Sequence, residues 1–352
     1  MEFFMNYAKR YRSHCAVIII FMVFWFCCPL LAQDKGSCKL SNENRQFIQK
    51  ALDDWSKVSR DLLKIDPRPL PWIILFDTSC VWHLAPDKEF LKDAEPAAAQ
   101  INFENQPVPV YARLHDGKLT LPNGSAIPAK GTAFSSLYNN EKKPFVVVSL
   151  LDVWRLNPGL ARRPGLADIM RGVICHENVH TRQLAMVAQK VNELKKRYSL
   201  PEDISDDIIE ERFGKIAEFK AAFETGSDIL YEAAAEKNAA RRDSLVAKVL
   251  KMVGNRKARY YKGVNKPYEE LEDLFLNMEG IAVWVTFKMP GMNKQQDMEK
   301  GKKIKRAKNS WSQDRGLVLF LLIEKMVSNW HQRVLGPELA SPYKLLEEAV
   351  KK

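Results

Sequence analysis

The spacing of apolar residues divides the chain after residue 32 into a mixed first part and a helical second part. Between residues 33 and 160, apolar positions at helical spacing over 41–65 predict one helix, with Ser41 as its N-cap. Short apolar runs bounded by turn residues then predict strands. These runs are WIILF (72–76), VPVYARL (108–114), KLTL (118–121) and PFVVVSLL (144–151).

From residue 161 to residue 352, apolar residues recur every three or four positions, which predicts helices almost throughout. The expected elements are a helix over 166–198, a helical region from 201 to 253, a loop over 254–267, helices over 268–288 and 310–335, and a short last helix. No repeat and no domain boundary is visible. The pattern therefore predicts a single helix-rich α+β domain over 33–352, with a small sheet near its start.

The first 32 residues follow a different pattern. Lys9, Arg10 and Arg12 precede an apolar run that extends from Cys15 to Ala32. This is the layout of a secretory signal peptide, with cleavage expected after Ala32. The run is also close to the length of a spanning helix, so an uncleaved anchor is the alternative. In both cases we expect the rest of the chain to be secreted, or to lie in a periplasm or cell envelope. Membrane contact is expected only through this segment, if it stays uncleaved.

The chain is basic, with a formal net charge of +11 at pH 7. Part of this charge comes from the run Lys300–Lys308, which contains no acidic residue. No interleaving of aromatic and basic residues accompanies the run, so we expect a solvated loop and no nucleic-acid partner. A membrane-surface protein without a metal is a further alternative that this run leaves open.

Three cysteines remain after the predicted cleavage, namely Cys38, Cys80 and Cys175. An odd number at this low density does not indicate a disulfide scaffold. Cys38 and Cys80 could pair in an oxidising compartment, but their spacing alone leaves this open. Cys175 is predicted to be a small core residue.

The stretch GVICHENVHTRQL (172–184) holds two of the six histidines, four residues apart. Continuing the apolar stripe of the predicted helix places both His176 and His180 on its inward face. Imidazoles among apolar neighbours need partners, and one metal ion can serve both rings. Glu177 lies about 100° around the helix from His176. It can there take a proton from a metal-bound water and pass it to a leaving amine. Two core histidines satisfied by backbone or carboxylate groups are the alternative.

His-Glu-x-x-His on a helix resembles the zincins, the metallopeptidases built around this motif. The resemblance implies one catalytic Zn²⁺, a water at its fourth position and a peptide or protein substrate. It also implies a short strand before the motif helix that pairs with extended substrate. PFVVVSLL (144–151) is suitably placed for that role, and an ordinary core strand is the equal alternative.

The third zinc ligand is expected to be a glutamate. The metzincin continuation is absent, because position 186 is Met. This departure points to the gluzincin branch, in which a Glu on a later helix completes the site. Glu279 starts a Glu-Gly-x-Ala-x-aromatic stretch similar to that of many gluzincins, and its own helix places no cation near it. Glu232, which resembles a Glu-x-x-x-Asp pattern with Glu236, and Glu224 remain the alternatives.

Weaker candidates surround this core set. In zincins a Tyr, His or Arg commonly stabilises the oxyanion of the tetrahedral intermediate. Thr181 or Gln183 could orient a metal ligand by a hydrogen bond from outside the ligand set. His83 and His115 are expected to have no metal role. The oxyanion candidates are Tyr260, Tyr261, His331 and Arg315.

The sequence therefore predicts an exported zinc-dependent metallohydrolase, and more specifically a peptidase. His176, His180 and Glu279 would hold the zinc, and Glu177 would act as general base and then as general acid. The alternative is an exported binding or structural protein whose metal site is degenerate or purely structural. Four protein ligands would favour the structural site, and an open fourth position would favour the catalytic one.

Overall fold

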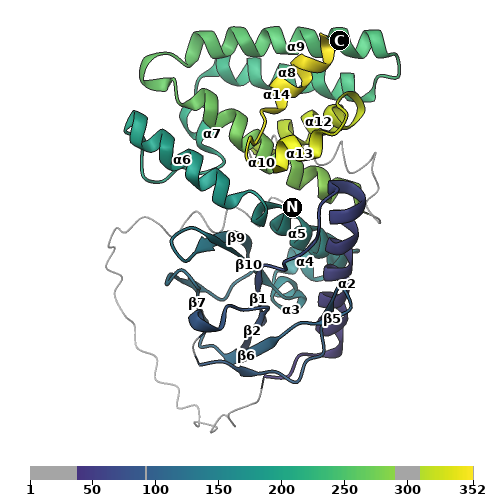
Figure 1. Cartoon of the computed structure of the whole chain (residues 1–352), viewed down its shortest axis with the longest axis vertical. Coiled ribbons are helices and arrows are strands. Elements are labelled where there is room, and N and C mark those ends of the chain that lie inside the picture. The colour runs from purple at the N-terminus through teal and green to yellow at the C-terminus, as the bar shows by residue number, and fades with distance from the viewer. Residues whose placement is uncertain (1–37, 92, 290–309, 352) are drawn as a thin grey trace.

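The structure is a computed structural model that describes residues 38–91, 93–289 and 310–351. The predicted signal peptide and the run Lys300–Lys308 lie outside the described residues. Figure 1 shows a sheet layer in the lower half of the molecule and a stack of helices above it. The expected helix-rich α+β fold, with its sheet near the start of the chain, is confirmed.

The main sheet has six strands in the order β3-β6-β2-β1-β10-β9. β1 and β10 pair in parallel, whereas the other neighbours are antiparallel. Alternate side chains of β1 and β10 contact the helices on one face and a smaller apolar cluster on the other, which explains why both runs are almost wholly apolar. The bounds are β1 (Trp72–Phe76), β2 (Cys80–Leu84), β3 (Glu95–Pro96), β6 (Val110–Leu114), β9 (Ala133–Tyr138) and β10 (Lys143–Ser149).

Two small hairpins and two short helical turns complete the sheet layer. The PNG stretch closes the second hairpin, as its turn chemistry predicts. The first hairpin joins β4 (Asn102–Phe103) to β5 (Gln106–Pro107), and the second joins β7 (Lys118–Thr120) to β8 (Ala126–Pro128). The turns are η1 (Ser59–Leu63), which continues the first helix, and η2 (Lys88–Phe90).

The helices begin with α2, which starts directly after Ser41. The Ser41 side chain accepts a hydrogen bond from the backbone N–H of Asn44, as expected of an N-cap. None of the helices within the described ranges is long and apolar enough to span a membrane. Their bounds are α2 (Asn42–Val58), α3 (Leu151–Arg155), α4 (Pro158–Ala161), α5 (Leu166–Thr181), α6 (Leu184–Tyr198), α7 (Ile208–Phe213), α8 (Ala217–Ala235), α9 (Ala239–Tyr260), η3 (Gly263–Asn265), α10 (Tyr268–Lys288), α12 (Trp311–Met326), α13 (Trp330–Leu335) and α14 (Pro342–Val350).

Three predicted helix boundaries are wrong. The helix expected over 166–198 is two helices, because the chain turns at Arg182 and buries the Gln183 side chain against α10. α9 continues to Tyr260 through the expected loop, because Lys257 pairs with Asp273 of α10 and so holds the last turns of α9 in place. The helix expected over 310–335 breaks after α12, where Asn329 adopts a positive φ of 53°.

The motif helix α5 occupies the centre of the molecule. It packs on α2, on β9 and β10, and on α10, and Figure 1 shows it between the sheet and the helical stack. Its residues from Gly172 to His180 are all buried. The prediction that the His-Glu-x-x-His helix lies in the core is therefore confirmed, and this position brings sheet and helices together at the motif.

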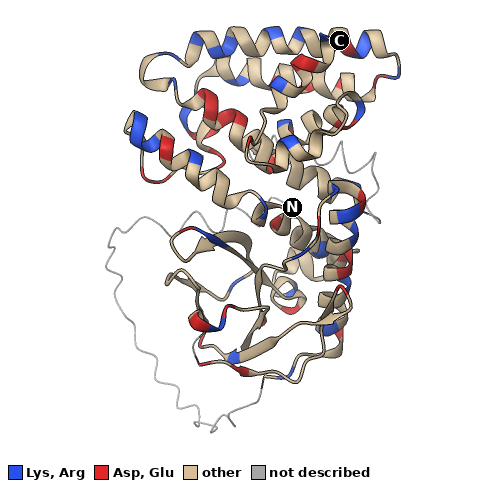
Figure 2. Cartoon of the chain, in the orientation of Figure 1, with Lys and Arg blue, Asp and Glu red and all other residues tan. Residues whose placement is uncertain are grey.

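Charged side chains lie mainly on the outer elements. Figure 2 shows Lys and Arg interspersed with Asp and Glu along α6 and along the helices at the top of the molecule. Both signs of charge therefore occur along these described helices.

A disulfide joins Cys38 to Cys80 at the start of β2, with 5.8 Å between the two Cα atoms. The pairing that the spacing left open is thus present, and Cys175 is free and buried as expected. Cross-linking two positions 42 residues apart restricts the unfolded chain.

The double variant Cys38→Ser/Cys80→Ser is expected to lose about 4 kcal/mol of unfolding free energy from this lost restriction. Denaturant titration of wild type and variant measures the difference. A reductant should move the wild-type midpoint to that of the variant and leave the variant unchanged. Equal midpoints before reduction would contradict the prediction.

Candidate metal centre

The two helices that carry the predicted ligands, α5 and α10, run antiparallel and touch at successive levels. At one end the Thr286 hydroxyl donates to the Gly172 carbonyl at 3.3 Å. At the other end the Gln183 amide donates to Asn277 Oδ1 at 3.0 Å. The two histidines and Glu279 lie between these contacts. The helices are therefore fixed on both sides of the candidate site.

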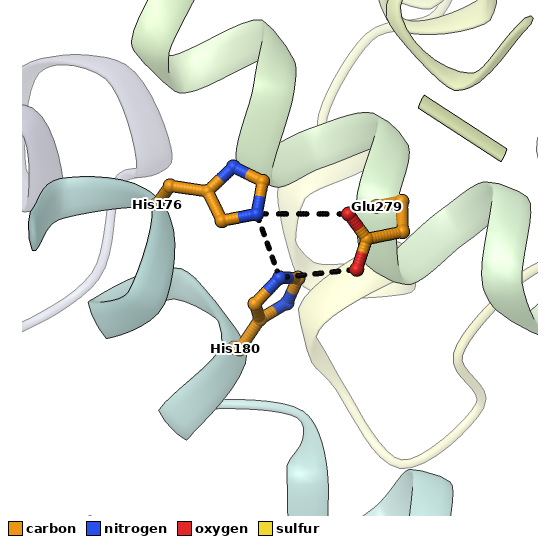
Figure 3. Close-up of side chains that lie close together, drawn as sticks. All are labelled: His176, His180 and Glu279. Carbon is orange, nitrogen blue, oxygen red and sulfur yellow. Dashed lines mark hydrogen bonds and ion pairs between the residues drawn. The ribbon is translucent and has the colours of Figure 1, made fainter. Parts of the chain in front are cut away.

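The structure brings His176, His180 and Glu279 together (Figure 3). The two Nε2 atoms are 2.9 Å apart. His176 Nε2 lies 3.6 Å from Glu279 Oε2, and His180 Nε2 lies 3.2 Å from Glu279 Oε1. A tetrahedral zinc ion with bonds of about 2.0–2.1 Å separates its ligand atoms by about 3.3–3.4 Å. The N···N and N···O separations lie close to this spacing, so the two Nε2 atoms and the Glu279 carboxylate fit around one ion of this size.

The donor set also fits a metal chemically. The side chains of His176, His180 and Glu279 are 3%, 7% and 3% exposed. Two imidazole nitrogens facing each other and one carboxylate suit a borderline divalent cation such as zinc. Among the described residues, no fourth His, Cys, Asp or Glu joins the group. This buried cluster could bind a metal ion through three protein ligands, with a fourth position left for another ligand.

The charges within the cluster are strongly coupled. Burial disfavours the charged form of His180, but the Coulomb attraction of Glu279 and its hydrogen bond more than offset this and raise the pKa of His180 to about 9. Burial acts on Glu279 in the opposite sense, yet the two histidines hold the pKa of that carboxyl well below its usual range. Glu279 thus prefers a cation beside it, and without a metal this cation is a protonated histidine.

Glu177 lies next to the cluster but does not belong to it. It is 5% exposed, and Ser135 on β9 donates a hydrogen bond to its Oε2 at 3.0 Å. One carboxylate oxygen is therefore tied to the edge of the sheet. The position beside the ligands, outside the ligand set, is the one that a general base for a metal-bound water requires.

Of the two alternatives left open for residues 144–151, the structure supports the ordinary core strand. β10 lies inside the sheet, paired on one side with β1 and on the other with β9. The edge strand is β9, which contacts α5 and carries Ser135. The apolar run of β10 is typical of a strand covered on both faces.

A cavity of about 470 Å³ opens beside the β9–β10 turn. α6, which follows the motif helix after two residues, forms its other wall. The cavity therefore offers polar and small side chains next to the edge strand. Its lining includes Asn140, Lys142, Ala185, Ala188 and Asn192.

The alternative third ligands lie elsewhere. Glu224 on α8 is within 3.9 Å of Lys220, one turn before it. Glu232 is exposed and pairs with Arg241 of α9 at 3.2 Å. Both fit the solvated charged helix that was their other explanation, and of the three candidates the structure brings only Glu279 to the histidines.

The weaker candidates have partners outside the cluster. Thr181 donates to a backbone carbonyl of its own helix, and the Gln183 side chain joins the α5–α6 break to α10. The oxyanion candidates have other contacts: Tyr260 with Glu218, Tyr261 with Glu272, Arg315 with Ser227 and Tyr343, and His331 with Trp330. His83 accepts a hydrogen bond from Trp72.

Two residues that contact the site were missed in the sequence. Ser135 lies in a strand of mixed polarity, and nothing in its spacing pointed to Glu177. Gln313 donates to Glu279 Oε2 at 3.1 Å. Its polar surroundings, SQDR (312–315), look like the exposed start of a helix, yet all four residues are buried. A polar run directly before an apolar helical run was the only available signal.

Comparison with known proteins finds no match for the chain, whether among family models, curated proteins or solved structures. The class that fold and site define is a helix-rich α+β protein with a buried His-His-Glu cluster able to hold a metal ion.

Proposed function

We propose that the protein is a zinc-dependent hydrolase of the zincin type, and specifically an exported peptidase with a gluzincin-like ligand set. One observation carries this proposal. His176, His180 and Glu279 form a three-ligand set among the described residues, while the adjacent Glu177 stays outside that set. A catalytic zinc site needs three protein ligands, an open fourth position and a nearby base.

When bound, zinc supplies a Lewis acid that polarises the scissile carbonyl and lowers the pKa of the attacking water. Glu177 accepts the proton of that water and later gives it to the leaving amine. Ser135 holds one oxygen of the Glu177 carboxylate, which leaves the other oxygen for this transfer. The edge strand β9 supplies backbone groups for an extended peptide, which favours binding with little sequence preference.

Export is supported by two observations. The first 32 residues have the layout of a signal peptide. The disulfide between Cys38 and Cys80 suits an oxidising compartment such as a periplasm or the outside of the cell.

A structural metal site in an exported binding protein is the second candidate, because the three ligands are nearly closed off from solvent. In that case the metal would stabilise the fold without activating water. Removing the metal with a chelator would abolish activity in a catalytic site, whereas it would unfold the protein in a structural site.

Metal removal tests the proposal. The purified chain should hydrolyse a mixture of peptides, and a chelator should abolish this activity. One equivalent of zinc, added after the chelator has been dialysed away, should restore it. Circular dichroism of the chelated protein provides the control, because the fold should persist. Metal binding without any hydrolysis, together with unfolding on chelation, would support the structural site and overturn the peptidase proposal.

A further inference from the structure

Gln313 on α12 lies outside the cluster and donates a hydrogen bond to the candidate ligand Glu279. Its Nε2 donates to Glu279 Oε2 at 3.1 Å, and Gln313 is 1% exposed. Glu279 Oε1 is the oxygen that faces His180 at 3.2 Å. The two oxygens of the carboxylate thus differ in their surroundings. Oε2 accepts the hydrogen bond from Gln313 and lies 3.6 Å from His176 Nε2, whereas Oε1 faces the Nε2 atom of His180 and has no bond to Gln313.

The contact depends on an unusually close approach of α10 and α12. A Cβ atom on Gly280 would lie 2.8 Å from the Cα of Gly316, so both positions exclude any larger residue. Gly280 directly follows Glu279, and Gly316 lies one turn after Gln313. Since residues three apart share a helix face, Gln313 and Gly316 lie on the side of α12 that meets α10. The glycine pair therefore allows the close helix approach at which Gln313 reaches Glu279.

A neutral amide is suited to this task. A Lys or Arg in its place would also hold the carboxylate, but its positive charge would offset the negative charge that attracts the metal. The Gln313 amide fixes the orientation of the carboxylate and leaves its full charge. Hydrogen bonds to metal ligands from outside the site typically change metal affinity by about 10–100-fold.

We propose that Gln313 is a positioning residue for the metal site: by holding Glu279 Oε2 it keeps Oε1 aimed at the ion and raises the affinity for zinc. This inference rests on the metal site of the proposed function. The bond would otherwise serve only to join α10 to α12, in which case its loss would lower the stability of the metal-free protein and leave zinc affinity unchanged.

The test compares Gln313→Met, which keeps the length of the side chain but removes the donor, with wild type. Zinc affinity is measured by competition with a chromophoric chelator. We expect the variant to bind zinc about 10–100-fold more weakly. Ser312→Ala provides the matched control, because this neighbour is buried on the same helix and its hydroxyl makes no hydrogen bond to Glu279. The zinc affinity of this control variant should stay within about twofold of wild type, because separate contacts usually act independently.

Two further measurements keep the outcome clear. Unfolding of each protein in excess chelator measures how much stability the metal-free variant has lost. A zinc affinity of Gln313→Met equal to that of wild type would overturn the proposal, however large this loss of stability is. If Gln313→Met does not fold, Gln313→Asn decides, because it keeps the amide and withdraws it by one methylene. Wild-type protein that binds no zinc would instead refute the metal site itself, so the two failures are distinguishable.

Discussion

Glu177→Gln is expected to slow peptide hydrolysis by about 10²–10⁴-fold, which is the usual contribution of a general base. The change replaces one carboxylate oxygen by an amide and keeps the size of the side chain. An amide cannot take up the proton of the attacking water, whereas it can still accept the hydrogen bond from Ser135. Zinc content should remain near one per chain, because Glu177 is not among the three ligands. Steady-state rates together with elemental analysis measure both quantities.

The matched control is Glu224→Gln, the same chemical change at a carboxylate that pairs with Lys220 on the surface of α8. Its activity and its zinc content should equal those of wild type. This control also tests the rejected alternative ligand, since a loss of zinc in Glu224→Gln would contradict the assignment to Glu279. Undiminished hydrolysis by Glu177→Gln would refute the role of Glu177 as base and would favour a metal site without catalysis.

The parts of the site that could be predicted share one property: they follow from local helical geometry. His176 and His180 are four residues apart on one helix, so their common direction depends only on α5. Glu279 was identified by what its own helix lacks, namely a cation for a carboxylate among apolar neighbours. The position of that carboxylate against the histidines depends on how α5 packs on α10, which the sequence indicated only through the resemblance.

The parts that could not be predicted depend on contacts between distant segments. Whether 144–151 is an edge strand depends on whether strands pair on both of its sides, and one of its two partners is the distant β1 (Trp72–Phe76). Gln183 reads as an ordinary helical residue, because the side chain that explains the helix break, Asn277, lies 94 positions further along the chain. The role of Gln313 could not be predicted for the same reason, since its partner Glu279 lies on another helix.

The Gly280–Gly316 contact shows where local and distant information meet. The sequence predicted that the small Gly280 allows another helix to approach, but it did not identify the helix. The structure assigns this role to α12, whose own Gly316 faces Gly280. The close approach explains why a glycine directly follows Glu279, the candidate ligand: a side chain there would move α12, and with it Gln313, away from Glu279.

His180→Ala is expected to remove the metal altogether. Two donors, His176 and Glu279, would remain, and they cannot supply the three protein ligands of a zinc site. Zinc content should fall from about one per chain to nearly none. In wild type, zinc at about a thousandfold excess over its dissociation constant should add about 4 kcal/mol to the free energy of unfolding, and in the variant it should add nothing. Elemental analysis and unfolding with and without zinc measure the two effects.

Loss of metal must be separated from loss of the fold, because His180→Ala also leaves Glu279 buried beside a single histidine. His180→Gln meets this need, since its amide can still donate to Glu279 Oε1 in place of the imidazole. We expect His180→Gln to unfold near the midpoint of chelated wild type and yet to bind little zinc. His115→Ala, which changes a histidine of the sheet layer bonded to the Asp77 carbonyl, should keep its zinc. Zinc retained at wild-type level in both His180 variants would mean that the zinc binds elsewhere and that the two histidines of α5 are packing residues. The hydrolase proposal, which rests on this site, would then be refuted.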